Sequence, residues 1–100
     1  MSFTTEKNTV AIHQIHFDNK TYQLNFPLRC QLEKEDGVFS ITSEMLDIIG
    51  TGVNEKDAYQ NFCQEFDFIY NRHNDLNDNQ LSNRLLNIKK IINLTVKGIL

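Results

Sequence analysis

The residues His13, His16 and Asp18 form the densest group in the chain that could bind a metal ion or transfer a proton. Imidazole and carboxylate groups serve as zinc ligands and as general acids or bases. Side chains alternate between the two faces of a regular strand, so His13 and His16 would point in opposite directions unless a bulge separates them. We therefore predict strand histidines beside a turn, with no catalytic residue and no metal site. A hydrolase built on these three residues is the alternative.

Two cysteines and one glycine-rich tract are the other candidates for chemistry. Cys30 and Cys63 lack a second Cys or His at metal-ligand spacing and sit in apolar registers, which predicts buried, reduced thiols in a cytoplasmic protein rather than a disulfide. His73 lies too far along the expected helix to activate Cys63. The tract 50–52 precedes a helix but lacks the Lys and hydroxyl of a phosphate-binding loop, so it predicts a structural turn and no cofactor.

Charge is divided unevenly along a chain whose formal net charge is −3. Residues 1–75 hold six Lys/Arg and twelve Asp/Glu, whereas residues 76–100 hold four and one. The four late cations form either a solvated helix face or a small basic patch for an acidic partner or a phosphate backbone. They are Arg84, Lys89, Lys90 and Lys97. No apolar run reaches the roughly 18–20 residues that span a bilayer, and the first residues do not resemble a signal peptide, so no membrane contact is expected.

Hydrophobic periodicity predicts the elements that would position these residues. Period-2 alternation indicates strands over 10–17, 22–32 and 38–42, with a short extended segment over 45–49. The first of these slips phase once, which indicates a bulge near His13-Gln14. In the second, even-numbered positions face the core, and Pro27 places the strand at an edge or interrupts it. Turns are expected at 18–20 and 33–37, where Asp, Asn and Gly tolerate positive φ.

Apolar positions three and four residues apart predict two helices. The first runs from Asn54 to His73 and covers the sheet with one stripe; the second begins after Asp78 or Asn79 and ends near Gly98. The fold class is therefore α+β: a small antiparallel sheet of three to four strands, one main helix on one face, and a second C-terminal helix. We predict a single domain over 1–100, with a flexible arm at 1–8, a core over 9–75 and the C-terminal helix over 76–100.

The second helix carries a stripe of apolar side chains, which must be covered either by the sheet or by a partner chain. Such a stripe in a short chain is often an oligomer contact, which predicts a homodimer. The stripe consists of Leu81, Leu85, Ile88 and Ile92.

The segment 35–70 resembles the HicB-like antitoxin family. The resemblance rests on the turn ending in Gly37, the strand Val38-Phe39-Ser40-Ile41, and the helix opening Gly52-Val53-Asn54-Glu55-Lys56-Asp57-Ala58. In physical terms, Gly52 permits a sharp turn, Asn54 caps the helix, and Asp57 places negative charge in its first turn. Ala58 then lets helix and sheet approach closely.

The resemblance implies a β-β-β-α domain like that of double-stranded-RNA-binding proteins, and a function that is not enzymatic. The expected function is that of an antitoxin, or a solitary relative, which binds and occludes a small basic RNA-cleaving toxin through its acidic surface. The alternative is a small structural or regulatory adaptor of phage or mobile-element origin, homodimeric and without a toxin partner.

Overall fold

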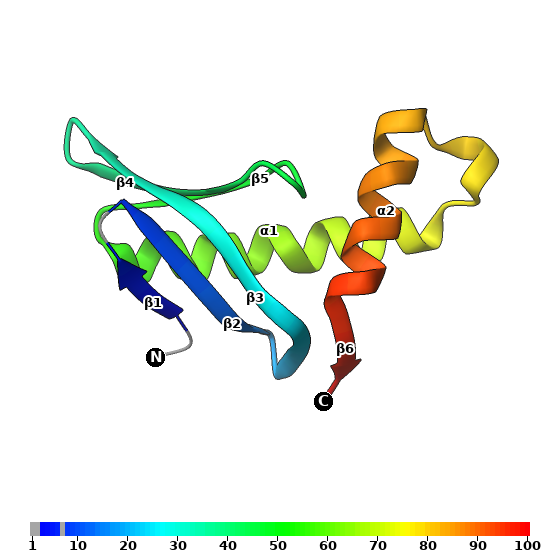
Figure 1. Cartoon of the computed structure of the whole chain (residues 1–100), viewed down its shortest axis with the longest axis horizontal. Coiled ribbons are helices and arrows are strands. Elements are labelled where there is room, and N and C mark those ends of the chain that lie inside the picture. Colours follow the sequence, from blue (N-terminus) through cyan, green and yellow to red (C-terminus); the bar gives the residue numbers. More distant parts are fainter. Residues whose placement is uncertain (1–2, 7) are drawn as a thin grey trace.

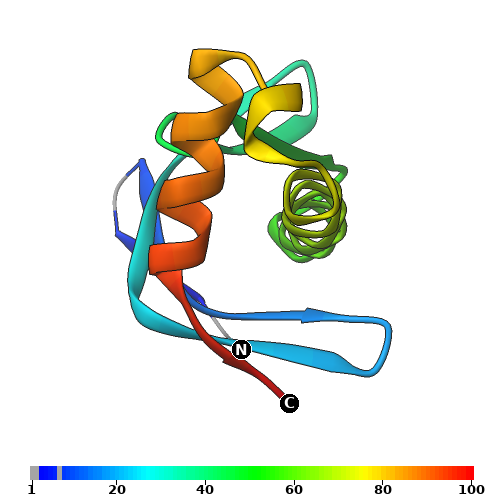
Figure 2. The same cartoon turned by 90° about the vertical axis from the view of Figure 1, so that its right-hand side faces the viewer.

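The computed structural model describes residues 3–6 and 8–100, with side chains from residue 8 onward. Among these residues, six strands form one antiparallel sheet that curls around a long helix, and a second helix stands at the end of the first (Figures 1 and 2). The α+β class is confirmed. Strand order is β1 (Phe3–Glu6), β2 (Thr9–Phe17), β3 (Lys20–Glu35), β4 (Val38–Ser43) and β5 (Ile48–Gly52), and β6 (Val96–Ile99) pairs with β3. The helices are α1 (Glu55–Asp75), the 3₁₀ turn η1 (Asp78–Gln80) and α2 (Asn83–Thr95).

The hairpin of β2 and β3 contains the predicted bulge. Asp18 and Asn19 turn the chain with φ of 51° and 65°, as their residue types predict. The pairing of β2 with β3 then shifts between Ile12, opposite Leu28, and Gln14, opposite Gln23. Because of this shift, the apolar residues of β2 before and after His13 can face the same side of the sheet, toward the core. The buried residues are Val10, Ile12 and Ile15.

Strand β3 is the longest strand of the sheet and its pairing changes along its length. Its second half pairs with β2 and β4, and its first half with β2 and β6. The segment around Pro27 lies in the interval where β3 has no register with β2. The prediction of an edge strand or a break at Pro27 is wrong, because β3 runs from Lys20 to Glu35 with neighbouring strands on both sides, and only its pairing with β2 is interrupted. The prediction that every even position is in the core is wrong for Phe26, which is 42% exposed, because the same interruption turns it away from α1.

The glycines of β5 have a different role from the predicted one. The tract 50–52 belongs to β5, and the turn comes earlier, where Asp47 adopts a φ of 55°. A Cβ atom on Gly50 would lie 2.4 Å from the backbone nitrogen of Phe62, and one on Gly52 would lie 2.5 Å from that of Ala58. The glycines are therefore required by the close approach of α1 to β5, rather than by a turn. The close helix–sheet packing predicted at Ala58, which is fully buried, is confirmed.

Helix α1 begins as its sequence predicts. The Asn54 side chain accepts a 2.8 Å hydrogen bond from the backbone N–H of Asp57, and the acidic first turn complements the helix dipole. The predicted stripe faces the sheet: Phe62 and Phe66 are fully buried, and Ile69 and Tyr70 pack against the core.

We expect Asn54→Ala to lower the free energy of unfolding by about 1 kcal/mol, because one backbone donor of the first turn loses its partner. Asn54→Asp should retain nearly all the stability, since a carboxylate accepts the same hydrogen bond and suits the helix N-terminus. Urea unfolding followed by circular dichroism measures both. Equal loss of stability in the two variants would show that Asn54 stabilises the protein by something other than its hydrogen bond to the Asp57 N–H.

The two ends of the chain hold strands that the sequence did not reveal. The predicted single helix over 76–100 is instead η1, then α2 capped by Ser82, then β6, so Gly98 lies in a strand and does not end a helix. Part of the predicted arm at 1–8 lies outside the described residues, but Phe3–Glu6 form β1 and pair with β2. Each of these two strands is four residues long and contains both polar and apolar residues. They are strands because β2 and β3 supply their hydrogen-bonding partners.

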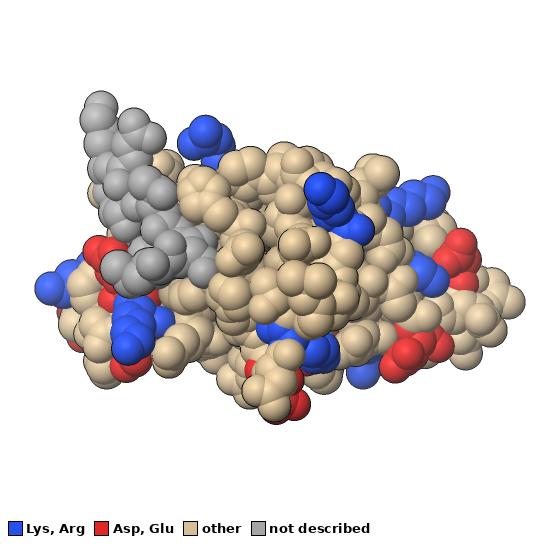
Figure 3. Space-filling model, turned by 90° about the horizontal axis from the view of Figure 1, so that it is seen from below, with Lys and Arg blue, Asp and Glu red and all other residues tan. Residues whose placement is uncertain are grey.

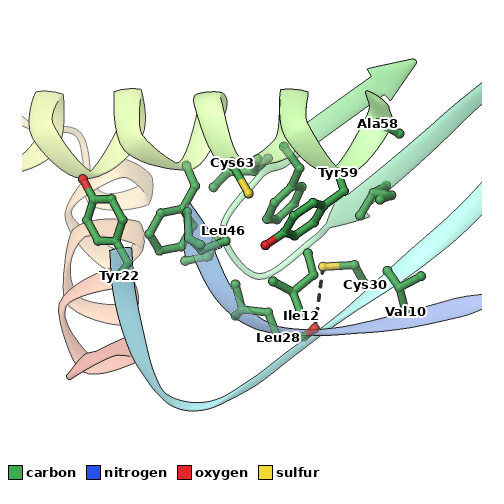
Figure 4. Packing of buried hydrophobic residues seen from close by; sticks show 14 of the residues in the cluster. Val10, Ile12, Tyr22, Leu28, Cys30, Leu46, Ala58, Tyr59 and Cys63 are labelled. Atoms are coloured by element: carbon green, nitrogen blue, oxygen red, sulfur yellow. Dashed lines mark hydrogen bonds between the residues drawn. The ribbon is translucent and has the colours of Figure 1, made fainter. Parts of the chain in front are cut away.

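One hydrophobic core lies between α1 and the sheet. Figure 4 shows Tyr59 and Cys63 reaching from α1 toward the sheet, where Ile12, Leu28 and Cys30 lie. Both cysteines are buried and free, as predicted, and burial raises the pKa of the Cys30 thiol to about 12. The pKa of Cys63 is raised for the same reason. Within the described residues, no helix has the length and apolar character needed to cross a membrane.

Candidate functional site

The three residues that could have formed a metal or acid–base site do not converge. The ring of His16 is held on the β2–β3 hairpin, with Nδ1 3.1 Å from Thr21 Oγ1 and Nε2 3.2 Å from Gln14 Oε1. His13 is exposed at the bulge, and Asp18 is exposed in the turn. Across residues 3–6 and 8–100, no three His, Cys, Asp or Glu side chains come together as a metal site.

The fold gives the four basic side chains of residues 76–100 different surroundings. Arg84 Nη2 lies 2.7 Å from Asp47 Oδ2, and Lys89 Nζ lies 2.9 Å from Asp78 Oδ1, so two of them pair with carboxylates of the same chain. Lys90 and Lys97 are exposed. On the face shown in Figure 3, Lys and Arg side chains are scattered, some among uncharged residues and some beside Asp or Glu. A continuous basic patch does not form there.

A buried carboxylate that the sequence analysis missed ties the β2–β3 hairpin to α1. Asp67 is 8% exposed, and its Oδ1 accepts hydrogen bonds from Lys20 Nζ and, at 2.6 Å, from the hydroxyl of Tyr22. Burial of Tyr22, followed by its bond to this carboxylate, raises the pKa of Tyr22. A sequence signal existed: Asp67 falls four residues after Cys63 and eight after Tyr59, in the register of the buried face.

Aromatic rings hold this ion pair in place. Tyr22 meets Phe66 and Tyr70 edge to face, with ring centroids 5.3 and 5.2 Å apart. The Lys20 ammonium lies 5.8 Å from the Tyr22 ring centroid. One end of the hairpin is thereby fixed against the middle of α1, and Phe17 at the end of β2 is placed beside that helix.

An open groove runs along α1 next to this buried pair. We call it the α1 groove; its volume is about 570 Å³, and its lining comprises Phe17, Gln64, Asp67, Phe68, Asn71, Arg72, Asp75 and Leu76. Phe68 is 55% exposed, whereas Phe17 is half-buried. Exposed aromatic side chains surrounded by amides and charges are the usual composition of a protein-binding surface. The groove is therefore suited to holding a partner's side chains.

Comparisons with known proteins give no counterpart for this chain. A scan against protein-family models returns no match, and searches of the curated proteins and of the solved structures return none either. The function is accordingly argued from the geometry of the groove and the charge of the chain.

Proposed function

We propose that the chain is a non-enzymatic protein-binding module of the HicB-like antitoxin kind, or a solitary relative, that binds and blocks a small basic RNA-cleaving protein. The contact surface is the α1 groove. The observation that carries the proposal is Phe68, a large aromatic side chain left 55% exposed beside Phe17 on the outer side of α1. Aromatic anchors of this kind supply most of the affinity of protein interfaces.

Charge supports a basic partner. The first 75 residues hold twelve acidic and six basic residues. Such an excess attracts a basic protein during diffusional encounter and suppresses binding to acidic ones. Asp75 lies at the groove itself, together with the buried Asp67.

The order of elements also supports the proposal. Strands β2, β3 and β4 precede α1, as in the β-β-β-α domain that the resemblance implies, with β1 added before them and β5 added between β4 and α1. The motif that carries the resemblance includes the Asn54 cap and the close packing at Ala58, and both have the local structure expected of them.

Co-expression with the product of the neighbouring reading frame tests this function. We expect a stable complex with a small basic protein, measured by affinity capture and by titration calorimetry of the purified pair. Phe68→Asp should weaken binding at least about tenfold, because it removes a central aromatic anchor and places a charge in the interface. Phe26→Asp is the matched control, since Phe26 is also an exposed aromatic residue but lies on β3, away from the α1 groove.

Failure to form any complex would overturn the proposed function, and equal weakening by both aspartate variants would overturn the assignment of the groove. The competing function is a homodimeric adaptor. It is favoured by the exposed apolar side chain of Leu94, 69% accessible, beside Leu86 on the outer side of α2. A chain that dimerises by light scattering and binds no basic protein would establish that alternative.

A further inference from the structure

His73 is a buried polar side chain without a hydrogen-bond partner. It lies in the last two turns of α1, is 3% exposed, and neither Nδ1 nor Nε2 has a partner among the described residues. A neutral imidazole carries one donor and one acceptor, and an imidazolium carries two donors. An unpartnered buried polar group is destabilising, because it gives up its hydrogen bonds to water. The packing around the ring must therefore favour its burial strongly enough to offset that cost.

Helix α2 packs against this end of α1 (Figure 2). The side chains of Asn74 and Asn93 exchange two amide hydrogen bonds of 3.1 and 2.9 Å, and Lys89 Nζ donates to the backbone oxygen of Leu76 at 3.0 Å. The inner face of α2 buries Ile88 and Ile92. His73 precedes Asn74 in α1, and the charge of Lys89 on α2 acts on its ring, so the ring lies beside the contact that attaches α2.

The charges around His73 oppose its protonation. Arg72 on α1 and Lys89 on α2 are the cations that act on the ring, and the carboxylate of Asp78 in η1 is bonded to Lys89 rather than to His73. Burial first, and then these two cations, lower the pKa of His73 below its ordinary value of 6.5. A charged ring would be left without an acceptor and beside like charge.

We propose that His73 is an acid-sensitive latch: its protonation in acid weakens the docking of α2 on the end of α1 while the sheet and α1 remain folded. The inference stands apart from the proposed function. The change is confined to α2 because it contributes two buried side chains to the core, Ile88 and Ile92, whereas α1 contributes five. The pairing of β6 with β3 holds the chain beyond α2. A helix of 13 residues is marginal on its own, so a released α2 loses its helical hydrogen bonds to fraying.

The direction and size of the pH effect on the docking of α2 follow from the linkage between docking and protonation of His73. The docked state keeps His73 neutral, and the undocked state lets it protonate at its ordinary pKa, so docking is strongest above the ordinary value and weakens as the pH falls below it. Between pH 7.5 and 5.5, the undocking equilibrium constant should rise about tenfold if the docked ring stays neutral.

Hydrogen exchange tests the latch. Protection factors, corrected for the pH dependence of intrinsic exchange, are measured at both pH values for amides of α2, such as Ile92, and of β4, such as Ile41. We expect the α2 protection to fall about tenfold at the lower pH in the wild-type chain while β4 is unchanged. His73→Phe and His73→Leu should abolish that fall, and His13→Gln, which alters an exposed histidine, should retain it.

An equal fall in wild type and His73 variants would overturn the proposal, as would a parallel loss of protection in β4. A second measurement uses the wild-type protein alone. An NMR titration of the His73 ring that gives its ordinary pKa would also overturn the latch, whatever the variants do.

Discussion

Replacing Gly50 with alanine is expected to remove a large share of the stability of this protein. The added Cβ would lie 2.4 Å from the Phe62 nitrogen and 2.5 Å from the Ala58 oxygen. Both are backbone atoms of α1, so no side-chain rotation relieves the contact and the helix must move away from β5. Overpacking of a core typically costs about 1–3 kcal/mol and more where the backbone must shift, against a total stability of about 5–15 kcal/mol. We expect a loss of at least about 3 kcal/mol.

Two other glycines provide matched controls. A Cβ on Gly98 would come no closer than 3.9 Å to any atom, so Gly98→Ala should change stability by less than about 0.5 kcal/mol. Gly37 has open space but a φ of 79°, and its alanine variant should lose about 1 kcal/mol through backbone strain alone. Urea unfolding of the three variants measures the order. Gly50→Ala unfolding at the same urea concentration as Gly98→Ala would disprove the close-approach explanation.

Replacing Asp67 with alanine should be the second most damaging change. The substitution leaves the Lys20 ammonium without its carboxylate and the buried Tyr22 hydroxyl without its acceptor. Leaving the buried Tyr22 hydroxyl without an acceptor costs about 1–3 kcal/mol. The loss of the ion pair adds less, because the Lys20 side chain is 36% exposed and water can solvate its ammonium. Thermal unfolding should show the loss.

The exposed ion pair of Asp47 and Arg84 is the control for this prediction. Its side chains are 56% and 72% exposed. Arg84→Ala should have no measurable effect, because it removes this pair without changing Asp47, whose φ is positive. A triple variant, Lys20→Met with Tyr22→Phe and Asp67→Leu, should recover much of the stability, since an apolar replacement leaves nothing unpartnered. If Asp67→Ala is as mild as Arg84→Ala, the bonds that Asp67 accepts from Lys20 and Tyr22 do not anchor the hairpin.

The features that could be predicted from the sequence are those whose causes lie within a few residues. Asp18 and Asn19 turn the chain because their side chains tolerate positive φ, and Asn54 starts α1 because its amide reaches a donor three residues on. The shift of register near His13-Gln14 was predictable for a similar reason, since a slip in an alternating pattern requires the pairing to change locally. The extra residues lie in β3, where residues 24–27 oppose His13 alone. The α+β class followed from these local patterns and from the apolar stripe of α1.

The candidate site depended on contacts that no local pattern encodes. Lys20 and Asp67 are 47 positions apart, and only the docking of the hairpin on α1 brings them together and creates the groove beside Phe68. The predicted role of the glycine tract 50–52 was wrong for the same reason. Glycine is required there because the backbone of α1 packs directly against the tract.

By itself, the sequence determined where the chain turns, which faces are apolar and where the main helix starts, because backbone preference and periodicity act over one or two turns of chain. Tertiary structure alone decided which polar residues are buried, which cations pair internally, and that the last residues form a strand. Those outcomes depend on whether water is excluded from a side chain and on which distant segments of the chain pack against it. The free energy of burying or pairing a residue is therefore set by the tertiary contacts around it.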